Sequence, residues 1–143
     1  MGRSSSEAGF VTVWVLGLTI MMLAIAGVTI DFWRAVATQR SVSSVVDSAA
    51  IAGSSGIDEA AFRASGGKVV QLDPARARAL AQHSLASQPE AARLVDTAID
   101  VTPARITVTA GRQLEFTLVR VLQPGEAPAV LHATSTVDAR RAG

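Results

Sequence analysis

The sequence predicts an α+β protein in which a long N-terminal helix packs against a small antiparallel sheet, with one or two short helices beside it. Three observations predict this fold class. No charged residue occurs from Ala8 to Ile30. Helical spacing of small apolar residues then continues as far as Gly53, and the last third alternates apolar and polar residues. A helix and a sheet each bury one apolar side, so packing the two together is the simplest architecture.

Residues 10–30 are predicted to form a transmembrane helix, preceded by a polar leader at residues 1–9. A helix of this length spans about 30 Å, the thickness of a bilayer's hydrocarbon core. Eleven of its residues are Phe, Val, Leu or Ile, and each favours insertion near the centre by about 0.3–0.6 kcal/mol. Thr12, Thr19 and Thr29 can donate their hydroxyls to helix carbonyls, so they oppose insertion little.

The same helix is predicted to continue beyond the membrane through residues 31–53. Asp31, Trp33 and Arg34 lie where it would leave the bilayer, so we expect them at the membrane interface, with Asp31 and Arg34 spaced as an i, i+3 pair. Neither proline nor glycine interrupts residues 31–52. The positions that would form a narrow apolar stripe on this outer half are Val42, Val45, Val46, Ala49 and Ala50.

Residues 54–143 are predicted to form a small extracytoplasmic α+β domain that begins with two short helices. The run Gly53-Ser54-Ser55-Gly56 ends the long helix. Residues 58–63 suit a short helix, which stops before Gly66-Gly67. Asp73 and Pro74 are typical of an N-cap and a first helical residue. The next helix ends before Pro89, and its expected inner face is Ala77, Leu80, Ala81, Ser84 and Leu85.

The C-terminal third is predicted to supply the sheet. Residues 97–102 and 105–110 alternate around Thr102-Pro103-Ala104 and indicate a hairpin. Ile106 and Val108 would face one side, and the threonines between and after them the other. Residues 114–122 fit a strand or an amphipathic helix, Pro124-Gly125 indicates a turn, and residues 130–139 suit a last strand.

Composition argues against several classes of function. Thirteen basic and twelve acidic residues give a net charge of +1, which does not suggest nucleic-acid binding. The chain contains no cysteine, and its two histidines, His83 and His132, have no ligand spacing. The carboxylates have no nucleophile or metal-ligand pattern near them, so we expect them to be helix caps or solvated surface; these are Asp47, Asp58, Glu59, Asp96 and Asp100. We therefore expect no enzyme, cofactor, metal or small-molecule substrate.

A family resemblance rests on the following pattern. A polar leader ends in glycine, and Phe10 opens a hydrophobic helix with an amphipathic outer half. This pattern resembles type IV pilin-like proteins. The runs Asp31-Phe32-Trp33-Arg34 and Asp47-Ser48-Ala49-Ala50-Ile51-Ala52-Gly53, with the late Thr/Val strands, resemble the TadE/TadG-like proteins of tight-adherence (Flp) pilus systems.

The resemblance implies a minor pilin or pilus-assembly component with other pilin or assembly subunits as partners. The leader would be cytoplasmic, the helix in the cell membrane, and the C-terminal domain outside, with display at the cell surface. A prepilin peptidase would cut between Gly9 and Phe10. Shaft-forming pilins usually carry glutamate at the fifth residue after the cut, but here that residue is Trp14. This departure favours a tip, initiating or membrane-retained component.

Three alternatives remain open on the residues alone. A secretory signal could be cleaved after Ala26, which would leave a secreted or anchored binding domain. Gly17, Ala24 and Gly27 could form a seam for helix dimerisation. Arg34 and Arg40 follow the span, whereas Arg3 alone precedes it, so the positive-inside rule leans toward a cytoplasmic C-terminus. The family resemblance implies the opposite orientation, with the C-terminal domain outside the cytoplasm, and we adopt that orientation.

Overall fold

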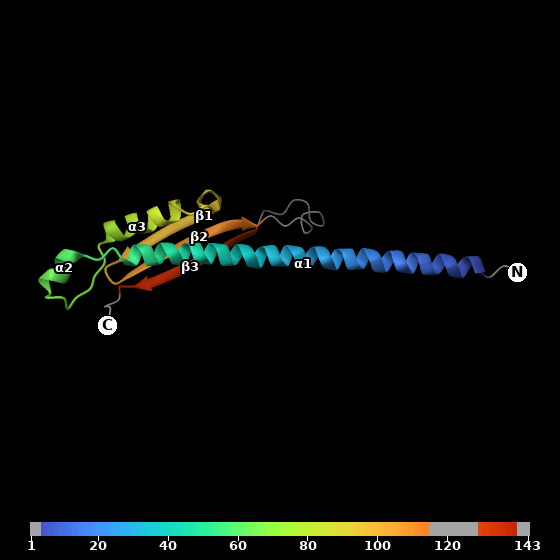
Figure 1. Cartoon of the computed structure of the whole chain (residues 1–143), viewed down its shortest axis with the longest axis horizontal. Coiled ribbons are helices and arrows are strands. Elements are labelled where there is room, and N and C mark those ends of the chain that lie inside the picture. Colours follow the sequence, from blue (N-terminus) through green and yellow to red (C-terminus); the bar gives the residue numbers. More distant parts are fainter. Residues whose placement is uncertain (1–3, 115–128, 140–143) are drawn as a thin grey trace. The chain divides into compact units, whose positions relative to one another are not determined.

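The computed structural model describes residues 4–114 and 129–139. Its elements are helix α1 (Ser4–Ser54), α2 (Glu59–Ala64), α3 (Pro74–Ala86), the 3-10 turn η1 (Ala91–Arg93), and strands β1 (Leu94–Thr102), β2 (Arg105–Leu114) and β3 (Ala129–Asp138) (Figure 1). The chain divides into two compact units. The first contains α1 up to Val36. The second contains α1 from Ala37 onward together with the other elements. The fold is therefore α+β, as predicted.

Helix α1 is longer than predicted at both ends. We expected a helix over residues 10–53, and the observed one runs from Ser4 to Ser54. A single glycine in a helix costs only about 1 kcal/mol relative to alanine, so Gly9 does not separate the leader from the apolar segment. The C-terminal end falls within the predicted Gly-Ser-Ser-Gly run.

The membrane-type segment of α1 stabilises its own polar groups. Thr19 donates its hydroxyl to the Val15 carbonyl at 2.8 Å, and Thr29 donates to Ile25 at 2.9 Å. Each bond returns one turn along the helix, which confirms the expectation for these two threonines.

The sheet has the order β1-β2-β3 with both pairs antiparallel (Figure 1). The predicted hairpin joins β1 and β2, and Thr102 pairs with Arg105 at its turn. Strand β2 pairs with β3 without a break over ten residues, from Arg105↔Asp138 to Leu114↔Ala129. Strand β1 instead has a bulge between Val95 and Ala98. Strand β1 begins at Leu94, three residues before the predicted Thr97.

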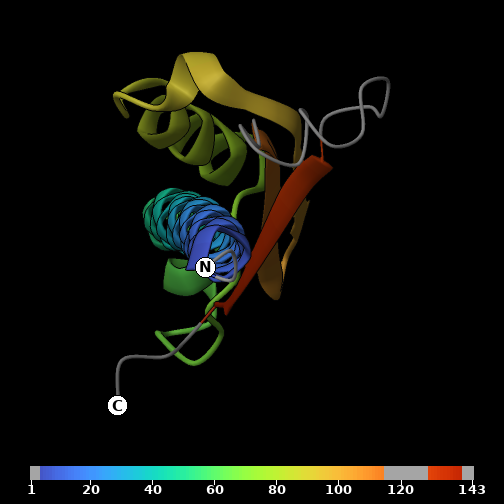
Figure 2. The same ribbon diagram turned by 90° about the vertical axis from the view of Figure 1, so that its right-hand side faces the viewer.

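The core of the second unit joins the outer half of α1 to the sheet and α3. All five predicted stripe residues of α1 are buried. They pack with Leu72 before α3, with one face of α3 and with alternate residues of β2, the last two groups being Ala77, Ala81, Leu85, Ile106, Val108 and Ala110. The side chains at Leu80 and Ser84 are only half-buried. Figure 2 shows the sheet on one side of the outer half of α1 and α3 on another.

The short helices are capped as their sequences predict. Asp73 accepts hydrogen bonds from the backbone N–H groups of Ala75 (2.9 Å) and Arg76 (3.1 Å) at the start of α3. Leu72, just before this cap, donates its N–H to the Pro103 carbonyl at 2.8 Å, which ties the helix entry to the hairpin turn. Of the ambiguous residues 114–122, Leu114 ends β2. The remainder, and the predicted Pro124-Gly125 turn, lie outside the described residues.

Candidate functional site

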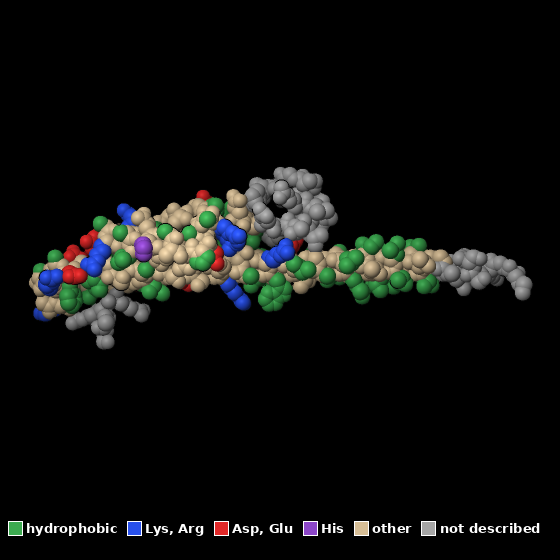
Figure 3. Space-filling model, turned by 45° about the horizontal axis from the view of Figure 1, so that its top comes forward, with side chains coloured by type: hydrophobic (Ala, Val, Ile, Leu, Met, Phe, Trp, Pro, Cys, Tyr) green, Lys and Arg blue, Asp and Glu red, His purple; other side chains and the backbone are tan. Residues whose placement is uncertain are grey.

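The candidate site begins with the apolar segment of α1, whose side chains have little protein around them. Phe10, Trp14 and Leu23 are 69%, 65% and 68% exposed. The described helix has a mean hydropathy of 2.3 over its most apolar 18-residue window, none of which is buried. Figure 3 shows hydrophobic side chains around this stretch of helix. A soluble protein would bury such a surface, so the segment is long and apolar enough to act as a single-pass membrane anchor.

The predicted cleavage residues lie on an open part of the helix. Gly9 and Phe10 are both exposed, and a β-carbon on Gly9 would meet nothing within 4 Å. A side chain at this position therefore meets no steric obstacle within the described residues.

The predicted interface residues differ in their exposure. Trp33 is 63% exposed, and Arg34 is exposed as well. Asp31 is only 5% exposed and is the one buried charged residue among those the structure describes. The placement of Asp31, Trp33 and Arg34 at a membrane interface stays a prediction. Trp33 keeps the exposure that an aromatic side chain at a membrane surface needs.

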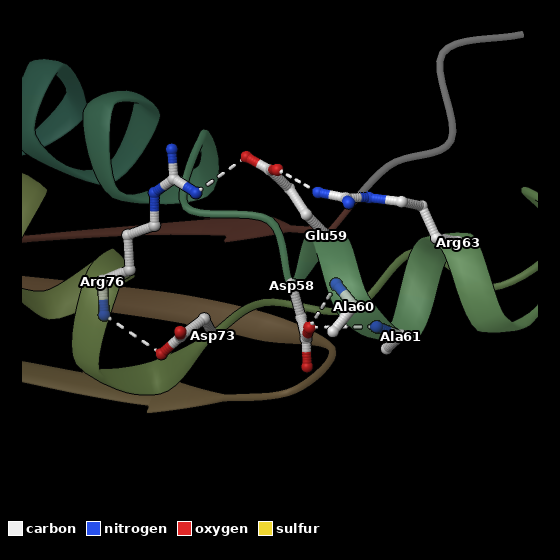
Figure 4. Close-up of polar contacts among 7 residues, drawn as sticks. All are labelled: Asp58, Glu59, Ala60, Ala61, Arg63, Asp73 and Arg76. Carbon is white, nitrogen blue, oxygen red and sulfur yellow. Dashed lines mark hydrogen bonds and ion pairs between the residues drawn. The ribbon is translucent and has the colours of Figure 1, made fainter.

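The carboxylates of α2 and α3 form a structural network (Figure 4). Asp58 accepts hydrogen bonds at 3.0 Å from the N–H groups of Ala60 and Ala61, so it caps α2. Glu59 binds Arg76 at 3.0 Å and Arg63 at 2.8 Å. Hydrogen bonds from Arg76 and then Arg63 lower the pKa of Glu59 because they favour its charged form. The ion pairs of Glu59 link α2 to α3, and the network contains no nucleophilic side chain.

One polar pair was not predicted from the sequence. Nε2 of His132 on β3 lies 3.3 Å from Oδ2 of Asp96 on β1, across the central strand. Asp96 has a left-handed φ of 52° in the β1 bulge, a conformation that Asp tolerates better than most residues. Gly111 lies between the two strands, and a β-carbon there would come within 2.9 Å of His132. The 36-residue separation left no local signal for this contact. No group of three metal-ligating side chains occurs among the described residues.

A comparison with models of protein families found a match in the N-terminal part of the chain. Residues 9–79 match the model of the Flp pilus-assembly TadE/G-like family. The match begins at Gly9, includes the rest of α1 and all of α2, and ends within α3, so the sheet lies outside it. Comparisons with curated proteins and with solved structures returned no match. The apolar segment and this match agree with the resemblance in the sequence: residues 9–79 are similar to the TadE/G-like family of Flp pilus-assembly proteins.

Proposed function

We propose that the chain is a minor pilin or pseudopilin-like subunit that helps to assemble a tight-adherence pilus from the cell membrane. One observation carries the proposal: the family match begins at the exposed apolar segment of α1 and continues into the folded second unit. An assembly role for this family does not require catalysis, and Asp58, Glu59 and Asp73 act as caps and ion pairs.

The proposed mechanism is helix–helix packing. In the bilayer, lipid covers the apolar side chains of residues 10–30, so this surface can later contact apolar helices of other pilus subunits with little change in polarity. Trp14 is neutral and exposed, and therefore needs no buried counter-charge when helices associate. This chemistry suits a tip, initiating or membrane-retained subunit.

Processing by a prepilin peptidase is part of the proposal. Cleavage between Gly9 and Phe10 would remove the residues that carry Arg3 and Glu7. Helix α1 would then begin with an apolar residue, and no charged leader would hold it at the cytoplasmic surface. The second unit would lie outside the cytoplasm and be displayed at the cell surface, in contact with other pilin or assembly subunits.

A pair of glycine variants tests the proposal. In cells that carry the matching pilus machinery, deletion of the gene should abolish surface pili, and the wild-type chain should restore them. Gly9→Leu should not restore pili, because the peptidase can no longer cut. The matched control is Gly9→Ala, which should restore pili because it adds only one methyl group at the same position, where an added β-carbon meets nothing within 4 Å.

The outcomes separate processing from folding. If both glycine variants restore pili, cleavage at Gly9 is unnecessary and the processing proposal is wrong. If deletion leaves piliation intact, the assembly role is wrong. A deletion strain with normal pili and a soluble fragment beginning near Gly27 in the medium would instead support the secreted binding domain.

A further inference from the structure

The outer half of α1 has a second face, which is exposed to solvent. We call it the outer stripe and define it as Ala37, Arg40, Ser44, Asp47 and Ile51, all of which are exposed. These residues recur every three or four positions and so share one side of the helix. The core residues of α1 occupy other positions. Figure 2 shows α1 with the sheet and α3 on two of its sides and a further side without a described element.

The outer stripe carries two charges of opposite sign, on Arg40 and Asp47. Neither Arg40 nor Asp47 forms an ion pair with any residue that the structure describes. By contrast, Asp58, Glu59, Arg63, Asp73 and Arg76 around α2 and α3 form helix caps and ion pairs (Figure 4). Both side chains are exposed, so they are available to pair with charges of another molecule.

The spacing of the stripe repeats every seven residues. Arg40 precedes Asp47 by seven positions, and Ala37, Ser44 and Ile51 follow one another at the same interval. If two copies of the helix lie parallel and are displaced by seven residues, about 10 Å along the axis, Arg40 of one copy faces Asp47 of the other. The same displacement sets Ala37 opposite Ser44, and Ser44 opposite Ile51. Two parallel helices without displacement would instead bring like charges together.

We propose that the outer stripe binds a second copy of this chain in parallel orientation, displaced by seven residues. The parallel orientation rests on the proposed function, because two copies anchored in one membrane by their N-terminal helices must point the same way. Such a contact is heterologous: each copy uses different residues of the stripe. A third copy can therefore follow the second with the same displacement, which suits a subunit that begins or joins an assembly.

The side chains of the stripe fit close contact between helices. Ala37 and Ser44 are small and let backbones approach. Ser48, beside the stripe, donates its hydroxyl to the Ser44 carbonyl at 2.8 Å, so the helix itself satisfies this polar group. Ile51 is 63% exposed, more than any other large hydrophobic residue described in the second unit. It provides the apolar contact, and the Arg40–Asp47 pair sets the register.

Cysteine cross-linking in membranes tests the register, because the 143-residue chain has no cysteine of its own. Two differently tagged copies carry Ala37→Cys and Ser44→Cys respectively and are co-expressed, then treated with a mild oxidant. A disulfide between the two tagged copies is expected, whereas each variant alone should give little. The matched control is the pair Thr134→Cys and Thr136→Cys on exposed positions of β3, which should not cross-link.

Charge reversal tests the contact that sets the register. Arg40→Glu or Asp47→Arg should reduce the cross-link by about three- to tenfold, because like charges then face each other. Both substitutions in the same chain recreate an opposite-charge pair and should restore it. Both positions are exposed, so a folding defect is not expected.

The outcomes decide the pairing separately from the pilus role. Preferential cross-linking of Ser44→Cys to itself would indicate an undisplaced or antiparallel pair and overturn the proposal. Absence of the mixed cross-link, or no recovery in the double charge reversal, would overturn it as well. If gene deletion abolishes pili but the mixed cross-link does not form, the pairing proposal is wrong and the assembly role stands. If the mixed cross-link forms in a strain whose pili do not need the gene, the assembly role is wrong and the pairing proposal stands.

Discussion

Gly56 lies directly against Ala77, where the end of the long helix meets α3. A β-carbon on Gly56 would come within 2.7 Å of both the backbone nitrogen and the Cα of Ala77. Gly53, one turn earlier, is similarly close to the Ala77 carbonyl oxygen, at 3.0 Å from an added β-carbon. Glycine at these positions lets the C-terminal end of α1 and the turn after it lie close to α3.

Gly56→Ala should therefore destabilise the second unit by about 1–3 kcal/mol, because backbone atoms would have to move. The measurement is urea unfolding of the detergent-solubilised chain, with hydrogen exchange at the amides of β2 as the readout. Ser55→Ala is the matched control, since Ser55 is exposed and should change stability by less than about 1 kcal/mol. Equal stability of Gly56→Ala and wild type would contradict the close contact.

The cap of α3 gives a second prediction. Asp73→Ala should cost about 1 kcal/mol, because two N–H groups at the helix start lose their acceptor. Asp73→Asn keeps an oxygen acceptor and should recover most of this loss. The same unfolding experiment compares the two variants. If Asn is as destabilising as Ala, the stabilisation does not come from the capping hydrogen bonds.

The ion pairs of Glu59 predict a dependence on pH. The pKa of Glu59 is lowered by Arg76 and Arg63, so the network stabilises the folded state above the ordinary pKa of 4.5. This contribution is lost as the pH falls through the lowered pKa. In an NMR titration, Arg76→Gln should raise the pKa of Glu59 more than Arg63→Gln does, since Arg76 is the larger cause.

A control variant checks the assignment of that shift. Arg78→Gln should leave the pKa of Glu59 unchanged, because Arg78 forms no ion pair among the described residues. An equal rise in all three variants would point to a general charge effect instead of the two contacts.

The proposed orientation predicts where a label can reach. A single cysteine at Thr134, an exposed position on β3, should react with a membrane-impermeant maleimide on intact cells. The proposed function places the second unit outside the cytoplasm. Labelling only after the cells are permeabilised would support the cytoplasmic C-terminus toward which the arginine distribution leans.

Local patterns in the sequence predicted most of the second unit. The helical spacing of Val42, Val45, Val46, Ala49 and Ala50 identified the buried side of α1. Asp73-Pro74 identified the start of α3, and alternation around Pro103 identified the hairpin. These features depend on neighbouring residues, which is why a single sequence contains them.

Features that depend on distant contacts were not predictable. The sheet order required the pairing of β2 with β3 across residues 115–128. The bulge at Asp96 follows from tertiary packing, and its contact with His132 joins two strands that are not neighbours. The burial of Asp31 had no local signal either, since the sequence placed it only at the end of the apolar segment, as an i, i+3 pair with Arg34. Gly53 and Gly56 were correctly taken as the helix end, but their close contact with Ala77 needed the structure.

The N-terminus of the mature protein tests the account's central claim most directly. The chain would be purified from membrane and medium fractions of cells that carry the pilus machinery, and its first residue would be determined by mass spectrometry. We expect a membrane-associated chain that begins at Phe10. A soluble chain that begins near Gly27, found in the medium, would contradict the membrane anchor and the pilus-assembly role together.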